Sequence, residues 1–290
     1  MENKLINFHI FRYHLLPLSK KNKQFEMFEN SDLSFEEIKE RKNEFFRNIL
    51  DELTSIENKH HPLKLEHNED DKYIFKMANK KTTRITQNFK NQIIANEPFC
   101  YIVFDNDPTV QKIAISDNPE AFSSPIVVKN NLRRIFRKGL EKYGLNIEIE
   151  QLFDKKGFWE YVKEHKKEIT YINFQFIKPN LANISRSLPE AFKDFANDTN
   201  SHDSHIIIKA PEKGTLDNIN KDNKDISGLV DYTSNGAGSI KLKVKGVRTQ
   251  LNTKENPKII KMAEIEEAEI EGSPEEVIKF YKTLMQFEID

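Results

Sequence analysis

The strongest constraint on the fold is the order in which strand and helix patterns follow one another along the chain. Apolar and polar residues alternate over 169–177, which is typical of a half-buried strand. Apolar residues recur at helical spacing over 34–56, after a capping box. Strand patterns at 99–104 and 110–115 are separated by a turn. This mixed order predicts an α+β fold with mostly antiparallel sheets and packed amphipathic helices, rather than repeated βαβ units.

The same patterns assign the rest of the chain. Further strands are expected at 5–15, 72–77, 147–152, 205–209, 239–247 and 259–270, and further helices at 132–143, 158–162, 188–195 and 274–285. Polar composition predicts loops at 60–71, 80–84 and 212–225. We expect the last two strands, 239–247 and 259–270, to form a pair.

Chain length bounds the number of domains. With 290 residues, of which 37% are hydrophobic, the chain can fill a sizeable core without metal or disulfide staples. We predict two domains. The first is an N-terminal α+β domain over 1–153, and the second is a C-terminal α+β domain over 154–290.

Cysteine usage and hydropathy indicate the compartment. The single cysteine, Cys100, lies in an apolar run and cannot form an internal disulfide, so we expect a buried thiol in a reducing cytoplasm. No apolar run reaches the roughly 18 to 20 residues of a membrane span, and the N-terminus lacks the pattern of a signal peptide. We therefore expect a cytoplasmic protein that does not insert directly into membranes.

Positive charge is concentrated on one expected helix. Overall, 45 basic residues nearly cancel 46 acidic ones, so global charge does not identify a partner. On a helical wheel of 132–143 with the apolar residues inward, four cations share the opposite face: Arg133, Arg134, Arg137 and Lys138. Guanidinium groups match phosphate oxygens, so this face is our leading nucleic-acid-binding candidate. A plain solvated face and an acidic protein partner are the alternatives.

Two further basic segments rank below that helix. The expected strand 239–247 presents a row of cations on one face, as a β-ribbon that reads a groove would: Lys241, Lys243 and Lys245. Its expected partner strand carries carboxylates that could neutralise the row: Glu264, Glu266, Glu267 and Glu269. The other segment is the expected loop with Lys80, Lys81 and Arg84, for which an ordinary surface loop is the alternative.

No segment carries a recognisable catalytic or cofactor motif. The glycine cluster 235–239 precedes a strand instead of a helix, which favours a turn over a phosphate cradle. Histidines at His202 and His205, and the group His60, His61 and His67, lack the second ligand pair of a zinc motif.

Carboxylates at expected strand ends are the remaining catalytic possibility. A nuclease needs carboxylates around a divalent ion, and four lie where strands end: Asp105, Asp107, Glu148 and Glu150. Turn composition explains the first two, and outward positions on an amphipathic strand explain the others. We therefore predict no catalytic residue, no metal site and no cofactor, although carboxylates from distant strands could still meet in space.

Several blocks resemble known protein families. In the middle of the chain, five segments resemble the RexA-like group of phage-exclusion proteins: Tyr73-Ile74-Phe75-Lys76 with the basic segment after it, 101–104, the amphipathic helix, 146–152 and 171–179. Two blocks towards the C-terminus are similar to another bacterial family whose members have a similar length. They are 174–180 and the stretch that begins with 237–246 and ends at Asn256-Pro257. None of these blocks is a catalytic motif, so the resemblance transfers no functional residue.

The resemblance implies a two-domain DNA-binding or partner-sensing component of a phage-exclusion system. We therefore expect a nucleic-acid-binding protein that favours duplex DNA and acts as a sensor or regulator. A homodimer and a protein partner from the same defence operon are also expected. A metal-dependent nuclease or toxin effector and a protein-binding scaffold are the alternatives.

Overall fold

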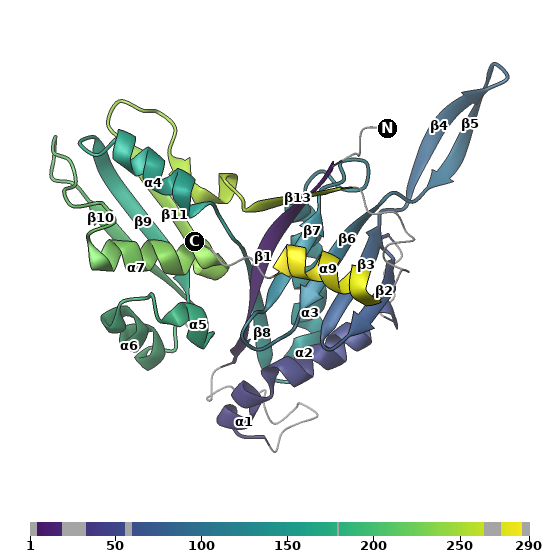
Figure 1. The fold of residues 1–290 in the computed structure, drawn as a ribbon, viewed down its shortest axis with the longest axis horizontal. Helices are drawn as coiled ribbons and strands as arrows, with labels where there is room; N and C mark the ends of the chain where they lie inside the picture. The colour runs from purple at the N-terminus through teal and green to yellow at the C-terminus, as the bar shows by residue number, and fades with distance from the viewer. Residues whose placement is uncertain (1–4, 19–32, 56–59, 179, 264–273, 286–290) are drawn as a thin grey trace.

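The computed structural model describes residues 5–18, 33–55, 60–178, 180–263 and 274–285. Within these residues the strands form two antiparallel sheets and one separate hairpin, and helices pack on the sheets (Figure 1). The predicted α+β class is confirmed. None of the helices in these ranges combines the length and the apolar character that a membrane crossing requires.

The first sheet is organised around its longest strand, β1 (Leu5–Pro17). On one side β1 pairs with β7 (Lys112–Ser116), and on the other side it pairs with β13 (Ile259–Ala263) and then with β8 (Leu145–Gln151). Beyond β7 the sheet continues through β6, β3 and β2, which span Phe99–Asp105, Lys72–Ala78 and Leu63–Glu69. The antiparallel pairing of β6 with β7 confirms the predicted hairpin.

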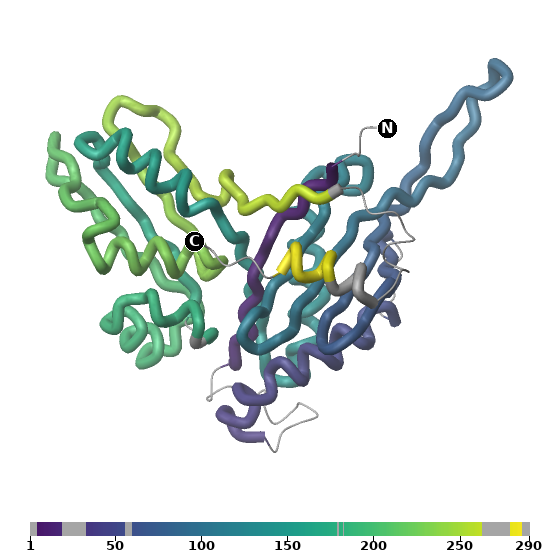
Figure 2. Tube along the Cα trace, viewed as in Figure 1, coloured from purple at the N-terminus to yellow at the C-terminus, as the bar shows by residue number. Residues whose placement is uncertain are grey.

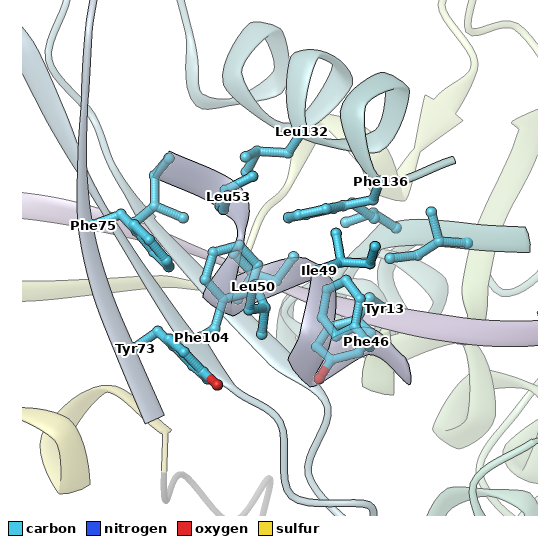
Figure 3. Close-up of a cluster of buried hydrophobic side chains, with 14 of the residues drawn as sticks. Tyr13, Phe46, Ile49, Leu50, Leu53, Tyr73, Phe75, Phe104, Leu132 and Phe136 are labelled. Atoms are coloured by element: carbon cyan, nitrogen blue, oxygen red, sulfur yellow. The ribbon is translucent and has the colours of Figure 1, made fainter. Parts of the chain in front are cut away.

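Both faces of the first sheet are covered. On one face, α2 (Lys42–Asp51) and α3 (Pro125–Glu141) bury their apolar sides against the strands (Figure 3). The rings of Phe46 and Phe136 meet there with their centroids 5.0 Å apart. On the other face, α9 (Pro274–Met285) closes a second apolar cluster. Burying each such large side chain stabilises the fold by about 1.5–3 kcal/mol, so these clusters hold the helices in place.

The second sheet has the strand order β10–β9–β11–β12, with bounds Asp203–Lys209, Ile169–Ile177, Gly238–Val244 and Leu251–Asn252. On one face of β9, Ile172, Phe174 and Phe176 are buried, which confirms the predicted alternation. The helices of this half contribute to the same core: α4 (Lys155–Glu164), α5 (Ala182–Ser185), α6 (Glu190–Asp198) and α7 (Lys224–Tyr232). The opposite face carries polar side chains.

Buried polar groups join the two sheets. The guanidinium of Arg12 on β1 donates to the backbone oxygens of Asn235 (2.6 Å) and Val110 (2.7 Å). The ring nitrogens of His14 lie 2.7 Å from the Gly236 carbonyl oxygen and 2.7 Å from Oδ1 of Asn180. Because Asn235 and Gly236 immediately precede β11, these bonds fix the second sheet against the first.

The C-terminal part of the chain returns to the first sheet. We predicted that 154–290 forms a single C-terminal domain, yet β13 pairs with β1 and α9 packs on the same sheet. Figure 2 shows this return of the yellow C-terminal segments across the first sheet. The predicted pairing of 239–247 with 259–270 is wrong. β11 pairs with β9 and β12, and β13 pairs with β1. Residues 264–270 lie outside the described residues.

Three local predictions also need correction. The segment 60–71 contains β2, an edge strand whose largely solvent-facing side chains give it a loop-like composition. The single helix predicted over 34–56 is interrupted at Arg41, which ends α1 (Phe35–Glu40) and begins α2. The predicted loop 212–225 ends in α7, where the Asn223 side chain accepts hydrogen bonds from the first turn of the helix.

Candidate nucleic-acid interface

The cationic face predicted on α3 is only partly available. The buried residues Leu132, Phe136 and Leu140 lie inward as expected. Arg133 and Arg137, however, both form ion pairs with Glu148 of β8, and the Arg133 Nη2 to Glu148 Oε2 distance is 3.3 Å. A carboxylate between two guanidinium groups cancels part of their attraction for phosphate, so the prediction that all four cations face solvent needs correction.

The other two α3 cations point to solvent. Arg134 and Lys138 are exposed, and neither forms an ion pair with the described residues. Arg134 Nη2 makes a 3.4 Å hydrogen bond to the Asn131 side chain. Lys129, which lies one turn before Arg133, is half-buried, and this burial lowers its pKa. The helix therefore offers two free positive charges where the sequence suggested four.

The row of lysines on β11 lies on the polar face of the second sheet. Lys241 and Lys243 are exposed, whereas Leu242 between them is buried. The register places Tyr171 of β9 between Lys243 of β11 and Lys209 of β10. Nζ of Lys243 lies 5.4 Å from the Tyr171 ring centroid. This face therefore combines cations with an aromatic ring. Lys245, the third predicted cation, is exposed just beyond the strand.

The predicted loop at 80–84 is instead the first strand of a projecting hairpin. β4 (Lys81–Gln87) and β5 (Lys90–Asn96) pair along their whole length. Asn88 and Phe89, with φ of 51° and 61°, form the two-residue turn between them. Figures 1 and 2 show the hairpin extending away from both sheets. We call residues 81–96 the arm.

The arm is exposed on both faces and at its tip. All its residues are exposed except Ile85, which is intermediate. Phe89 at the tip is fully exposed, and Ile93 is 68% exposed. An isolated two-stranded hairpin is marginally stable in water, and exposed apolar groups of this size mark interaction surfaces. The arm therefore has the properties of an element that is completed by a partner.

The arm carries only positive charge. Lys81, Arg84 and Lys90 are its charged residues, and 81–96 contains no Asp or Glu. At its base, Lys81 Nζ donates to the Glu120 carbonyl oxygen at 2.6 Å. Just before the arm, Nζ of Lys80 lies 3.9 Å from Oε1 of Glu97. Within the described ranges, Arg84 and Lys90 have no ion-pair partner. Their charges are therefore available to a polyanion. The β-branched residues around Arg84 could have indicated that this segment is a strand rather than a loop.

The carboxylates considered for nuclease chemistry lie in separate environments. Asp105 is buried, which raises its pKa, and it accepts a hydrogen bond from the Asp107 backbone N–H at 3.0 Å. Glu148 pairs with the two α3 arginines, and Glu150 lies 3.5 Å from Lys254. In the described part of the chain, no three His, Cys, Asp or Glu side chains are arranged to hold a metal ion.

The remaining chemical candidates have structural roles. Cys100 is buried, and burial raises the pKa of its thiol to about 12. On the polar sheet face, Nε2 of His205 lies 3.6 Å from Oδ2 of Asp203, and its Nδ1 lies 3.3 Å from Oδ1 of Asn173. The glycine cluster runs from the end of a π-helical turn, Thr233–Ala237, into the start of β11. A side chain at Gly236 (φ +78°) would meet Leu152 and Arg12 at 2.6 and 2.7 Å, so the glycine permits close approach of the two sheets.

The geometry thus leaves the arm, the lysine row and two α3 cations as surfaces for an anionic partner. Comparison with known proteins supplies no relative from which a role could be carried over. No protein-family model, no curated protein and no solved structure matches the chain.

Proposed function

We propose that the protein binds nucleic acid, with duplex DNA favoured, and that the arm is its principal contact. The observation that carries this proposal is that 81–96 is a projecting hairpin with cations and without carboxylates. In this proposal the protein acts as a non-enzymatic sensor or regulator of an antiphage defence system in the cytoplasm. The defence role, the homodimer and the partner from the same operon follow from the resemblance to phage-exclusion proteins.

The shape of the arm suits a DNA groove. The major groove of B-DNA admits a two-stranded β-ribbon. Cross-strand partners share a face, so Arg84 and Ile93 lie on one face, and Thr83 and Ile94 lie on the other. Arg84 can bond phosphate oxygens through its guanidinium fork, and Phe is a residue type that contacts the thymine methyl group in the major groove, as the exposed Phe89 ring could.

Other cations can extend the contact beyond the arm. Lys241 and Lys243 on the polar sheet face, and Arg134 and Lys138 on α3, are exposed. Each cation that neutralises a phosphate releases a counterion and adds to the salt dependence of binding. We assign these residues a supporting role because they lie on the sheet and helix surfaces, whereas the arm projects from them and is exposed on both faces.

A protein partner is the second candidate function, and the apolar content of the arm favours it. Ile93 is 68% exposed, Ile94 is 42% exposed, and Phe89 is fully exposed. Such side chains are suited to β-augmentation or to insertion into a protein groove. In that case the arm joins a second copy of the chain or the partner protein, and DNA affinity does not depend on it.

Replacing 82–95 with the dipeptide Asn-Gly separates the two functions. This change closes the hairpin on the Lys81–Asn96 pair with a favourable two-residue turn. The arm proposal expects the shortened protein to keep its fold by circular dichroism and to lose binding to a fluorescent duplex. Unchanged DNA affinity refutes the arm as the DNA contact. If the shortened protein instead changes its oligomeric state in light scattering, the protein-partner function is supported.

A further inference from the structure

A groove in the second half of the molecule has a composition that the proposed DNA contact does not use. It lies between α4 and the segment 219–221, and its volume is about 410 Å³. That volume falls within the roughly 300–1,000 Å³ of pockets that hold small ligands. Since α4 packs into the core of the second sheet, the groove is held by a regular element rather than by loops alone.

The floor of the groove is apolar. Trp159, Val162 and Ile219 line it, and they are 7%, 3% and 6% exposed, respectively. Trp159 and Val162 project from α4 three residues apart, so they lie on the same side of the helix. The indole packs against the Phe158 ring, with the centroids 5.3 Å apart. This neighbour limits the orientation of the indole and gives the floor a fixed aromatic surface.

The rim of the groove is cationic. Four lysines line it, namely Lys156, Lys163, Lys166 and Lys221, and Glu160 is the one carboxylate among the lining residues. Four positive charges less one negative charge leave an excess of three. No ion pair joins these groups to any other side chain in the described ranges, and all five are exposed. Cations held around a concave surface raise the local concentration of anions.

We propose that this groove binds a nucleotide unit, with the planar base on the Trp159 floor and the phosphate groups on the lysine rim. An inorganic anion uses only the rim, and an uncharged apolar ligand leaves the lysines without a partner. A base attached to phosphates uses both surfaces, and base–aromatic contacts combined with lysines are typical of nucleotide recognition. The unit comes from a free nucleotide or from a single-stranded nucleic acid, whose local chemistry is the same.

The chain provides a direct readout of this site. Trp159 is its single tryptophan, so intrinsic tryptophan fluorescence reports on the groove alone. A base that contacts the indole quenches this emission. The first titration uses ATP, with inorganic triphosphate as a ligand that lacks the base, and the second uses a short oligodeoxythymidine. We expect ATP or the oligonucleotide to quench the emission saturably and to bind more tightly than triphosphate.

Matched variants identify the surface involved. Lys163→Gln combined with Lys221→Gln should raise the ligand concentration that gives half-maximal quenching at least tenfold. Lys167→Gln is the control, because Lys167 is exposed in the turn that follows α4 but does not line the groove. No quenching by either ligand overturns the proposal. So does quenching that the double variant leaves unchanged. Where ATP quenches the emission, triphosphate that competes with ATP as tightly as ATP itself binds also overturns the proposal.

The two sources of the nucleotide unit give different outcomes. Saturable quenching by ATP assigns the site to free nucleotides, whereas quenching by the oligonucleotide alone assigns it to single-stranded nucleic acid. The inference is independent of the arm, because the protein with 82–95 replaced keeps α4 and 219–221. That variant should lose duplex binding and retain quenching, so failure of one proposal is distinguishable from failure of the other.

Discussion

The Nε atom of Arg12 donates a hydrogen bond of 2.6 Å to the backbone oxygen of Asn235. These residues lie 223 positions apart in the chain, so the bond links the first strand of the first sheet to the turn that precedes β11. Burial lowers the pKa of Arg12 to about 10, which leaves the guanidinium charged at neutral pH. A charged group in the interior is costly unless its donors are satisfied, and backbone oxygens supply that satisfaction here.

Removal of the Arg12 side chain should weaken the junction between the sheets. Arg12→Met leaves the partly buried carbonyl oxygens of Asn235 and Val110 without these donors, which should cost roughly 1–3 kcal/mol. Arg134→Met is the control, because Arg134 is exposed, and it should change stability by less than about 0.5 kcal/mol. Urea unfolding of both variants measures the difference. Equal stabilities contradict the role assigned to Arg12.

The buried imidazole of His14 should make stability depend on pH. Burial lowers its pKa from 6.5 to about 4, although its hydrogen bonds to Gly236 and Asn180 act in the opposite direction. The unfolded chain therefore binds the proton more readily. Stability should be complete above pH about 6.5 and should fall by up to roughly 3 kcal/mol as the pH drops to about 4.

His14→Gln isolates this effect because glutamine does not titrate. The variant should be less stable than the natural protein near neutral pH, yet it should lose less stability on acidification. Denaturant unfolding at a series of pH values between about 7 and 4 gives both quantities. Parallel pH profiles for the two proteins count against His14 as the titrating group.

Two glycines near β11 should respond differently to alanine. A Cβ at Gly238 (φ +154°) would lie 2.0 Å from the Gln175 carbonyl oxygen, so Gly238→Ala should cost at least about 3 kcal/mol. At Gly246 (φ +79°) a Cβ would meet no atom within 4 Å, and the cost should be limited to backbone strain of roughly 1 kcal/mol. Thermal unfolding of the two variants gives the comparison. Similar losses are inconsistent with the close approach of β9 and β11.

The paired arginines of α3 should matter for stability more than for DNA binding. Arg133→Gln with Arg137→Gln removes the partners of the largely buried Glu148, which should cost about 1–3 kcal/mol. Duplex affinity and its salt dependence should change little, since Glu148 already cancels part of the attraction of these two cations for phosphate. A loss of DNA affinity at unchanged stability is the opposite of this expectation.

The sequence was most informative where local rules decide the structure. Helix α3 ends before Gly144, whose φ is +66°, close to the predicted end at 143. It begins at Pro125, ahead of the predicted start at 132. The alternation in β9 also emerged as predicted, because one face of that strand is buried and the other is polar. In these elements, short-range periodicity and packing agree.

Long-range contacts account for what the sequence did not reveal. Glu148 of the neighbouring strand β8 pairs with Arg133 and Arg137 of α3, and a helical wheel cannot include a residue from another element. β13 pairs with β1, about 250 residues earlier in the chain, and no local pattern names so distant a partner. The arm escaped detection because its turn, Asn88-Phe89, lacks the glycine that usually marks a tight hairpin.

The salt dependence of duplex binding tests the central claim most directly. Lys81→Gln, Arg84→Gln and Lys90→Gln together remove the positive charge of the arm, and Lys167→Gln, Lys213→Gln and Lys279→Gln remove three exposed charges elsewhere. Fluorescence anisotropy at several salt concentrations should show that the arm variant binds more weakly and that its slope of log K against log salt is smaller by about 2–3. The control variant should match the natural protein. An arm variant with unchanged affinity and slope contradicts DNA binding through the arm.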